Sequence, residues 1–300
     1  MILACLVTYN PNVELLSEII DTLNKKGVFI ILIDNNSSDK KFLNLLQNKI
    51  NYLIVLDNNI GLGAAYNLCC KVSKDASAEW VLFLDQDSVP LESLNLYEII
   101  EKIRYNKILY NRTAIISVNP NTATKLKRIN NDFYLAKYVV GSGMIVKTEI
   151  CNRSKFLEEL FLYSIDIEYS TRIRRAGYLI LAYREQGINY KIGEKTEKYK
   201  KFISNVIVTT LSKLMHKDLS QYPYYSNPIR YYIMLRNNIY LLVRRKVELS
   251  YSKYLPIFIL MIYERLGLKD TVKLTLRALK YGILGRLEED NKKVFGGTGV

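Results

Sequence analysis

The chain has 300 residues, of which 49% are hydrophobic, and a formal net charge of +14 at pH 7. This composition is typical of a globular protein with one large or two smaller hydrophobic cores, and it excludes an intrinsically disordered chain. No run of roughly 18 apolar residues exists, and the first residues, MILACLVTYN, lack the basic region and cleavage site of a secretory signal. We therefore expect a cytoplasmic protein.

Short apolar runs alternate with helical patterns through the first part of the chain. The runs cover residues 2–9, 28–34, 52–57 and 80–85, and the helical patterns between and after them cover 15–23, 40–49, 61–74 and 94–103. Such alternation predicts an α/β fold with a mainly parallel sheet flanked by helices. In sheets of this kind, ligands bind beyond the carboxyl ends of the strands.

All four predicted strands end in polar residues. These ends are Thr8–Asn10, Asp34–Ser37, Asp57–Gly61 and Asp85–Asp87. Any one of them is explained by a turn or a helix cap, but four along one edge favour a binding site. The first turn, TYNPN, lacks the glycine-rich loops of dinucleotide-binding enzymes, nucleoside triphosphatases and sugar-nucleotide pyrophosphorylases.

The fourth strand end carries two carboxylates in a DxD pattern, Asp85 and Asp87. At a strand end the chain is turning, so both side chains can approach one ion. Such an oxygen-rich pair suits Mg²⁺ or Mn²⁺, with further ligands from water and a diphosphate. The alternative is a solvated turn before Ser88–Pro90, and the position directly after a buried strand favours the metal site.

Several motifs in order resemble those of inverting GT-A glycosyltransferases of the large family 2 type. They are TYNPN, IDNNSSD, DNNIGLGAAYN, EWVLFLDQDSVP, VVGSGMIV, SIDIEYSTRIRRAGY and NPIRYYIMLRNN, which together span roughly the first 245 residues. The sequence EWVLFLDQDS is similar to that found in the rhamnosyltransferase branch of this family. The resemblance implies a GT-A nucleotide-diphospho-sugar transferase fold, in which residues 1–118 bind the nucleotide sugar and residues 119–194 face the acceptor.

The resemblance also implies roles for individual residues. Base and ribose would be held by Thr8, Asn10 and Asp34, with Asn59 and Gly61 nearby. Asp85 and Asp87 would bind ribose, metal and diphosphate. The acceptor side would be lined by Gly141, Ser142 and Gly143, since small residues let a sugar approach the backbone closely.

Transfer with inversion needs a base that takes the proton from the acceptor hydroxyl. The family's base matches Asp166, near the start of a predicted helix that continues through Ile173. The only histidine, His216, lies beyond all these motifs. Glu168 and Arg172 are spaced as an ordinary i,i+4 ion pair.

Two positions depart from the family pattern. Relatives often carry Asp at the position of Tyr163. They also often carry His a few residues before the glycine matching Gly193, where this chain has Tyr190. Such a histidine can help to bind metal or diphosphate, so its absence leaves the metal site less complete.

The basic residues are concentrated in the last third of the chain. Residues 1–194 contain 23 Lys and Arg against 21 Asp and Glu, whereas residues 195–300 contain 20 against 8. This shift predicts a catalytic domain over 1–194 and a basic helical region over 195–300, with helices at 227–246, 254–268 and 270–284. The basic region is either a packed or oligomerising subdomain, giving a homo-oligomer, or a peripheral element on the inner face of the cell membrane, held there by basic residues and the apolar run 254–263.

The favoured function is transfer of rhamnose from dTDP-rhamnose onto a glycan or lipid-linked acceptor in bacterial-type surface polysaccharide synthesis. A UDP-hexose or UDP-galactofuranose donor is the alternative within the same fold. A basic nucleic-acid-binding protein is the distant alternative, since the acidic strand ends would repel phosphate without a metal. The four cysteines form no CxxC or zinc pattern and are expected to be buried, reduced thiols: Cys5, Cys69, Cys70 and Cys151.

Overall fold

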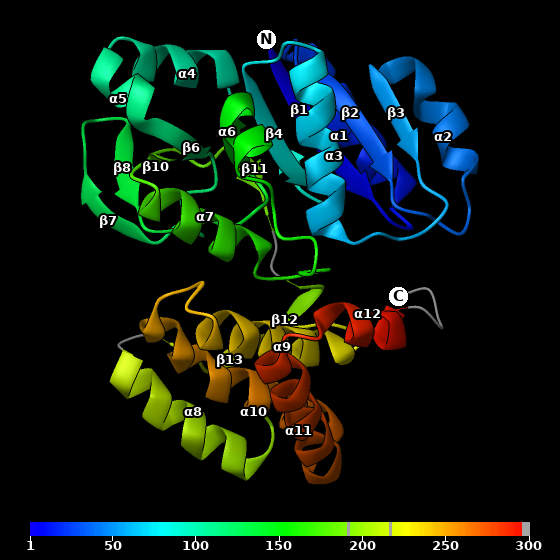
Figure 1. The fold of residues 1–300 in the computed structure, drawn as a ribbon, viewed down its shortest axis with the longest axis vertical. Coiled ribbons are helices and arrows are strands. Elements are labelled where there is room, and N and C mark those ends of the chain that lie inside the picture. The colour runs from blue at the N-terminus through cyan, green and yellow to red at the C-terminus, as the bar shows by residue number, and fades with distance from the viewer. Residues whose placement is uncertain (191–192, 216–217, 296–300) are drawn as a thin grey trace. The chain divides into compact units, whose positions relative to one another are not determined.

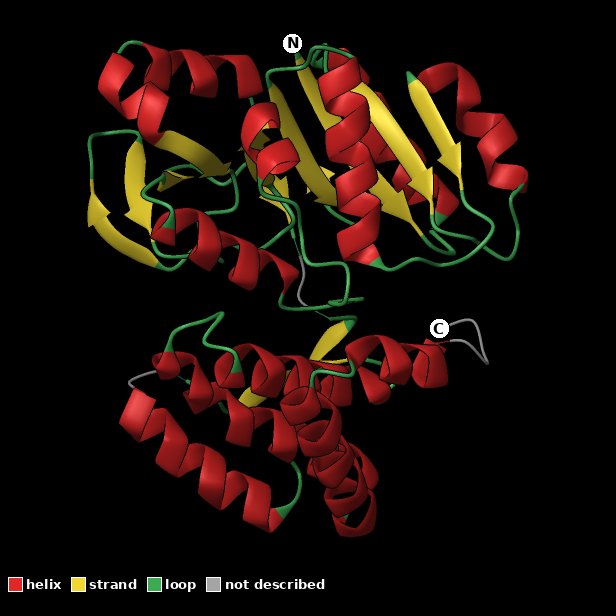
Figure 2. Ribbon diagram, in the orientation of Figure 1, coloured by secondary structure: helices red, strands yellow, loops and turns green. Residues whose placement is uncertain are grey.

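The computed structural model describes residues 1–190, 193–215 and 218–295 (Figures 1 and 2). The chain divides into two compact units, Met1–Tyr190 and Lys191–Val300. The first unit ends at Tyr190, whereas the sequence analysis placed its end at residue 194. His216 lies outside the described residues.

The first unit is built on a nine-stranded sheet in the order β3-β2-β1-β4-β9-β6-β10-β8-β7. Its four predicted strands are parallel neighbours: β1 (Ile2–Thr8), β2 (Phe29–Asp34), β3 (Tyr52–Val55) and β4 (Trp80–Asp85). The remaining strands are β6 (Thr113–Ser117), β7 (Lys125–Arg128), β8 (Phe133–Ala136), β9 (Met144–Lys147) and β10 (Leu179–Tyr183). Of these, β9 runs antiparallel between β4 and β6. The predicted α/β fold is confirmed.

Helices cover both faces of this sheet. They are α1 (Val13–Lys25), α2 (Lys41–Leu46), α3 (Leu62–Asp75), α4 (Leu96–Arg104), α5 (Lys107–Arg112), α6 (Thr148–Arg153) and α7 (Ile165–Arg175). Ala4 and Leu6 of β1 share a core with Leu16 and Ile19 of α1. Because side chains alternate along a strand, Cys5 points to the opposite face, where α3 packs on β1 and β4. Burial on both faces explains why these strands are continuous apolar runs.

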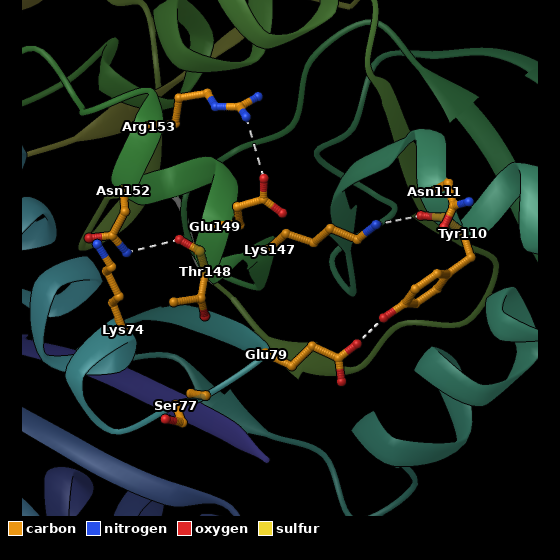
Figure 3. A pocket seen from close by; sticks show the side chains of 11 residues that line it. Lys74, Ser77, Glu79, Tyr110, Asn111, Lys147, Thr148, Glu149, Asn152 and Arg153 are labelled. Carbon is orange, nitrogen blue, oxygen red and sulfur yellow. Dashed lines mark hydrogen bonds and ion pairs between the residues drawn. The ribbon is translucent and has the colours of Figure 1, made fainter.

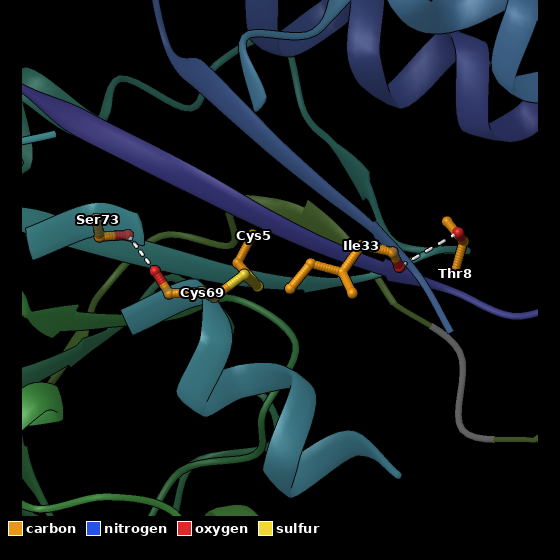
Figure 4. The surroundings of a disulfide bond; sticks show 5 residues. All are labelled: Cys5, Thr8, Ile33, Cys69 and Ser73. Atoms are coloured by element: carbon orange, nitrogen blue, oxygen red, sulfur yellow. Dashed lines mark hydrogen bonds between the residues drawn. A yellow bond between two sulfur atoms is a disulfide. The ribbon is translucent and has the colours of Figure 1, made fainter. Parts of the chain in front are cut away.

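Cys5 of β1 and Cys69 of α3 form a disulfide across that second face, with their Cα atoms 6.1 Å apart (Figure 4). The expectation of four reduced thiols is therefore wrong for this pair, while Cys70 and Cys151 are free and buried. The two partners are 64 residues apart in the sequence. Only the packing of α3 on the sheet brings them together, which no cysteine spacing reveals.

The second unit is helical, as predicted. It has a two-stranded antiparallel sheet of β12 (Lys195–Lys198) and β13 (Gln221–Tyr224), which are separated in the chain by α8 (Phe202–Met215). The other helices are α9 (Ile229–Val243), α10 (Leu255–Leu266), α11 (Leu268–Leu284) and α12 (Leu287–Phe295). The central helix α9 packs against both α10 and α11. No helix among the described residues combines the length and the apolar character that crossing a bilayer requires.

A buried ion pair joins three helices of this unit. The guanidinium of Arg236 (α9) and the carboxylate of Asp290 (α12) are 2.5 Å apart, and both side chains are fully buried. Arg277 of α11 and the hydroxyl of Tyr232 also donate to Asp290. Paired and hydrogen-bonded in this way, the buried charges fix α12 against α9 and α11.

Candidate functional site

The strand order places a topological switch point between β1 and β4, since β2 lies on one side of β1 and β4 on the other. Ligands of open α/β sheets bind at such a point, beyond the carboxyl ends of the strands. In the register of the sheet, Thr8 pairs with Asp34 and Val7 with Asp85. Three of the predicted site residues thus lie on adjacent strand ends.

The end of β2 is held by a network around Asp34, whose side chain is fully buried. The Thr8 hydroxyl donates to Asp34 Oδ1 at 3.2 Å, and the Ser37 hydroxyl donates to the same oxygen at 2.5 Å. The Ser37 backbone N–H donates to Oδ2 at 3.1 Å. These donors fix the orientation of the carboxylate, as a buried polar group requires.

Asn10 ties the first loop to the second. Its backbone N–H donates to the Ser37 hydroxyl and its side-chain oxygen accepts from Ser38 N–H, both at 2.8 Å. Its φ of 47° lies in the left-handed region, which Asn tolerates better than most residues. Asn10 itself remains exposed, so its side chain lies at the surface of the site.

Gln86, which sequence reasoning did not single out, joins the loops that follow β1 and β4. Its side-chain oxygen accepts from Tyr9 N–H at 2.8 Å, and its side-chain N–H donates to the Tyr9 carbonyl at 3.2 Å. Gln86, the residue between the two carboxylates of the DxD pattern, therefore holds the loops after β1 and β4 together at the switch point. In the sequence, the sign of this role was the position of Gln86 inside the DxD motif.

Asn59 and Gly61 shape the loop before α3. The Asn59 side chain accepts from Gly61 N–H at 3.0 Å, and Leu62 N–H donates to the Phe161 carbonyl at 2.8 Å. Gly61 has a φ of +81°, and a Cβ there would lie 2.7 Å from the Phe161 ring. Asn59 and Gly61 therefore contact each other and the segment before α7. The predicted metal-binding carboxylates lie elsewhere, beyond β4.

Three carboxylates gather beyond β4: Asp85, the exposed Asp87, and Asp166 from the start of α7. Burial raises the pKa of Asp85 to about 7, helped by the negative charges of Asp87 and Asp166. Burial likewise raises the pKa of Asp166, and the backbone N–H groups of Gly141 and Ile167 oppose that rise. Mutual repulsion of this kind is what a bound cation relieves.

Tyr66 of α3 belongs to the same group. Its side chain is only 2% exposed. Burial raises its pKa well above the usual value, with further contributions from the charges of Asp85, Asp166 and Tyr190. Tyr190 therefore lies near this cluster.

The segment Gly141 to Gly143 connects the carboxylates. Gly141 N–H donates to Asp166 Oδ2 at 2.7 Å, and the buried Ser142 hydroxyl accepts from Asp85 N–H at 3.2 Å. Gly143 N–H donates to the Phe83 carbonyl at 2.9 Å. This segment, predicted to face the acceptor, thus fixes the positions of Asp85 and Asp166 relative to one another.

Asp166 follows a strained turn. Tyr163 and Ser164 have φ values of 65° and 64°, in the left-handed region. Such conformations cost roughly 1–3 kcal/mol each in residues other than glycine and cluster at functional sites. They allow α7 to begin where Asp166 meets Gly141. The predicted ion pair of Glu168 and Arg172 is present, at 2.8 Å.

The sequence profile described as glycosyl transferase family 2 matches residues 4–164. The chain belongs to this family. The family that the motifs resemble is thereby confirmed, and the protein is a glycosyltransferase.

A dTDP-rhamnosyl transferase and two solved structures are similar to this chain. The dTDP-rhamnosyl transferase RfbF of Shigella flexneri is 24% identical over 264 residues, covering 84% of this chain and 83% of that protein. Among solved structures, S. aureus TarS is 15% identical with a TM-score of 0.49; the match covers 93% of this chain but only 55% of the TarS chain. TarS residues 1–349 in complex with UDP are 16% identical with a TM-score of 0.49, covering 95% of this chain and 91% of that one.

The carboxylates beyond β4 bear on metal binding by this glycosyltransferase. No group of three or more His, Cys, Asp or Glu side chains in the described part of the chain is arranged to hold a metal ion. Asp85 and Asp87 nevertheless provide the donor set that Mg²⁺ uses when it takes one or two carboxylates and completes its shell with substrate phosphates and water. The raised pKa of Asp85 fits a site that gains from positive charge.

A separate cavity of about 790 Å³ lies at the other end of β4 (Figure 3). Its lining includes Glu79, which precedes the first residue of β4, and Lys147, which ends β9. Lys147 Nζ donates to the Tyr110 carbonyl at 2.5 Å, and the Tyr110 hydroxyl donates to Glu79. Because Asp85 ends β4 at the opposite edge of the sheet, this cavity is not part of the candidate site.

Proposed function

We propose that this glycosyltransferase transfers a sugar, with inversion, from a nucleotide-diphosphate donor to a hydroxyl of a glycan or lipid-linked acceptor in surface polysaccharide synthesis. The observation that carries the proposal is the cluster of Asp85, Asp87 and Asp166 at the switch point between β1 and β4. Rhamnose from dTDP-rhamnose is the favoured donor, because the relative RfbF is a dTDP-rhamnosyl transferase.

The donor's nucleoside would lie over the ends of β1 and β2. Asp34 offers a fixed, buried acceptor for ribose hydroxyl or base N–H groups, held by Thr8 and Ser37. Asn10 offers an exposed amide beside it. Pre-fixed polar groups of this kind supply orientation and specificity in a largely apolar pocket. Asn59 and Gly61 would act through the shape of the neighbouring loop.

The diphosphate would lie over the end of β4. Asp85 and Asp87 would hold Mg²⁺ or Mn²⁺ there, and the ion, when bound, supplies positive charge opposite the departing diphosphate. Ser142 keeps the Asp85 backbone in place at 3.2 Å, and Gln86 fixes the loop between the two carboxylates.

Asp166 would accept the proton of the attacking hydroxyl. Burial raises the pKa of Asp166 and so brings that pKa closer to neutral pH. A general base is most effective when its pKa lies near the pH at which the enzyme works. The hydrogen bonds from Gly141 at 2.7 Å and Ile167 at 2.9 Å keep its oxygens in a defined orientation. Small residues at 141–143 leave space for the acceptor sugar beside it.

A donor screen tests the proposal. The purified chain is incubated with dTDP-rhamnose, UDP-hexoses and UDP-galactofuranose in the presence of Mg²⁺ or Mn²⁺, and released nucleotide diphosphate is measured. We expect the highest rate with dTDP-rhamnose and a loss of that rate in Asp85→Ala. Preferred release from a UDP sugar would replace the rhamnose donor, and no release from any nucleotide sugar would contradict the proposed reaction.

We also propose that the second unit brings the enzyme to a membrane surface, where a lipid-linked acceptor would be found. The support is its excess of basic residues, 20 against 8 acidic ones over residues 195–300.

A further inference from the structure

Helix α11 carries an apolar stripe on its exposed face. Its members are spaced by three or four residues and so share one side of the helix. They are Leu268, Val272, Leu276, Leu279 and Ile283, with exposed fractions of 69%, 51%, 62%, 39% and 50%. The opposite side of α11, with Ala278 and Gly282, is buried, and Gly282 lies against α9. The helix is therefore apolar on its solvent side as well as its core side.

Exposed lysines border this stripe. Lys269, Lys273 and Lys280 lie along one edge of it at a helical repeat of 3.6 residues per turn, and all three are exposed. The one acidic residue of α11 is Asp270, which projects away from the stripe in the first turn. An apolar sector edged by lysines is the pattern of helices that lie in a lipid interface, where the long side chains reach the head groups.

Helix α8 shows a second exposed apolar face. Phe202, Ile203, Val206 and Leu214 are 81%, 54%, 51% and 73% exposed, while Ser204 and Val208 face the core. No Asp or Glu occurs between residues 202 and 215, and Lys213 lies near the end. Exposed apolar surface on this scale marks an interaction site.

The apolar run that the sequence analysis offered as the contact of a peripheral membrane element is buried or half-buried. The run 254–263 falls largely in α10, where Ile257, Leu260, Met261 and Ile262 are buried, and none of its residues is exposed. Its side chains build the core of the second unit with α9 and α11. The exposed apolar side chains of the second unit therefore lie on other helices.

We infer that the α11 stripe and the exposed face of α8 are the surfaces through which the chain lies on an anionic lipid membrane. Charge selects this occupant over a second copy of the chain. In an antiparallel symmetric pair formed through the stripe, Lys269, Lys273 and Lys280 of both copies would lie along the same side of the interface and repel one another, whereas anionic head groups would neutralise them. The inference rests on the membrane partner of the proposed function and is tested without sugar transfer.

Vesicle co-sedimentation of the full chain is the first test. The probes are vesicles of phosphatidylcholine alone and vesicles that also contain phosphatidylglycerol. We expect binding to the anionic vesicles that weakens as salt is raised, because exposed charges are screened beyond about 8 Å at physiological ionic strength. The double variant Val272→Asp/Leu276→Asp should lower the binding constant by roughly tenfold or more.

Matched substitutions in the first unit serve as controls. Leu45→Asp/Ile108→Asp changes two side chains that are 70% and 75% exposed, and it should leave vesicle binding unchanged. Lys269→Gln/Lys273→Gln/Lys280→Gln should remove most of the salt-sensitive binding, whereas Lys41→Gln/Lys107→Gln/Lys127→Gln, three exposed lysines of the first unit, should not. Donor hydrolysis in solution should persist in all four variants, which separates this inference from the proposed reaction.

A fluorescent reporter distinguishes lipid from a second copy. The chain has one tryptophan, Trp80, and it is fully buried in the first unit. In Leu276→Trp, a quencher attached to the lipid tails should reduce the emission of the new indole. Equal vesicle binding by the stripe variant and the unaltered chain would overturn the inference. So would no binding to anionic vesicles at low salt, or a dimer in solution that the stripe variant dissociates.

Discussion

The two units differ in how they place polar and apolar groups. The first unit buries its central apolar strands β1 and β4 and gathers carboxylates at one edge of the sheet, where Asp85 and Asp166 have raised pKa values. The second unit buries an ion pair, Arg236 with Asp290, and leaves leucines on its surface. Folding alone explains neither the gathered carboxylates of the first unit nor the exposed leucines of the second. The carboxylates indicate a chemical site, and the exposed leucines indicate a contact surface.

The largest effect is expected inside the second unit. Asp290→Ala removes one partner of a fully buried pair and leaves the Arg236 guanidinium uncompensated. Breaking such a pair costs about 3–5 kcal/mol. Glu289→Gln, at a neighbouring position whose ion pair with Lys293 is partly exposed, should have a much smaller effect, because solvent screens that pair.

Thermal unfolding followed by circular dichroism measures the difference. A similar melting temperature for Asp290→Ala and Glu289→Gln would mean that the buried pair does not hold the second unit together. The first unit should keep its donor binding in both variants if the two units differ as described.

The next effect concerns the base. Asp166→Asn keeps the size of the side chain but cannot accept a proton, so transfer should fall by roughly two or more orders of magnitude. Donor binding should persist, because Asp34 and the DxD carboxylates are unchanged. Asp75→Asn, at the exposed carboxylate that ends α3, is the matched control and should retain transfer.

Single-turnover transfer and calorimetric donor binding, measured on the same preparations, check this prediction. Near-normal transfer by Asp166→Asn would remove Asp166 from the reaction and leave the strained turn at Tyr163 and Ser164 without its proposed purpose.

Much of the first unit could be predicted from the sequence. Continuous apolar runs such as Trp80–Leu84 are typical of strands covered on both faces, and the polar residues after them are displaced to one edge. The antiparallel insertion of β9 between β4 and β6 could not be predicted, because its pairing joins distant segments. For the same reason the sequence did not reveal the hydrogen bond between Gln86 and Tyr9 or the disulfide between Cys5 and Cys69.

The second unit was predicted less well because periodicity does not say which side of a helix is covered. The apolar residues of α11 were visible in the sequence, but two of its sides are apolar. Only the packing of α9 against Gly282 shows which one is buried. Conversely, the run 254–263 is more hydrophobic than the apolar stripe of α11, and for that reason it contributes buried side chains to the core of the second unit.

A smaller effect is expected at the metal site. In Asp87→Ala the remaining carboxylate, Asp85, cannot alone offset the loss of water from a divalent cation, so nucleoside diphosphate should bind roughly tenfold more weakly in the presence of Mg²⁺ or Mn²⁺. Calorimetric titration with the cation and with a chelator makes the comparison. If affinity is the same in the variant and the unaltered chain under both conditions, Asp87 holds no cation.

The smallest effect is a displacement of the pH profile. Burial raises the pKa of Asp166, although hydrogen bonds from Gly141 and Ile167 limit the rise. The proposed base works in its deprotonated form, so activity is lost as pH falls through the raised pKa.

The acid side of the kcat/KM profile should therefore lie well above the value of about 4 that an unperturbed aspartate gives. Asp75→Asn should leave it in place, because that carboxylate is exposed and lies at the C-terminal end of α3, away from the cluster. Asp166→Glu should move it, because a longer side chain cannot keep both backbone hydrogen bonds, at 2.7 Å and 2.9 Å, that favour the charged form. An acid limb near the ordinary value, unaltered in Asp166→Glu, would show that the carboxylates beyond β4 behave like those on the surface, and the contrast between the two units would then rest on the second unit alone.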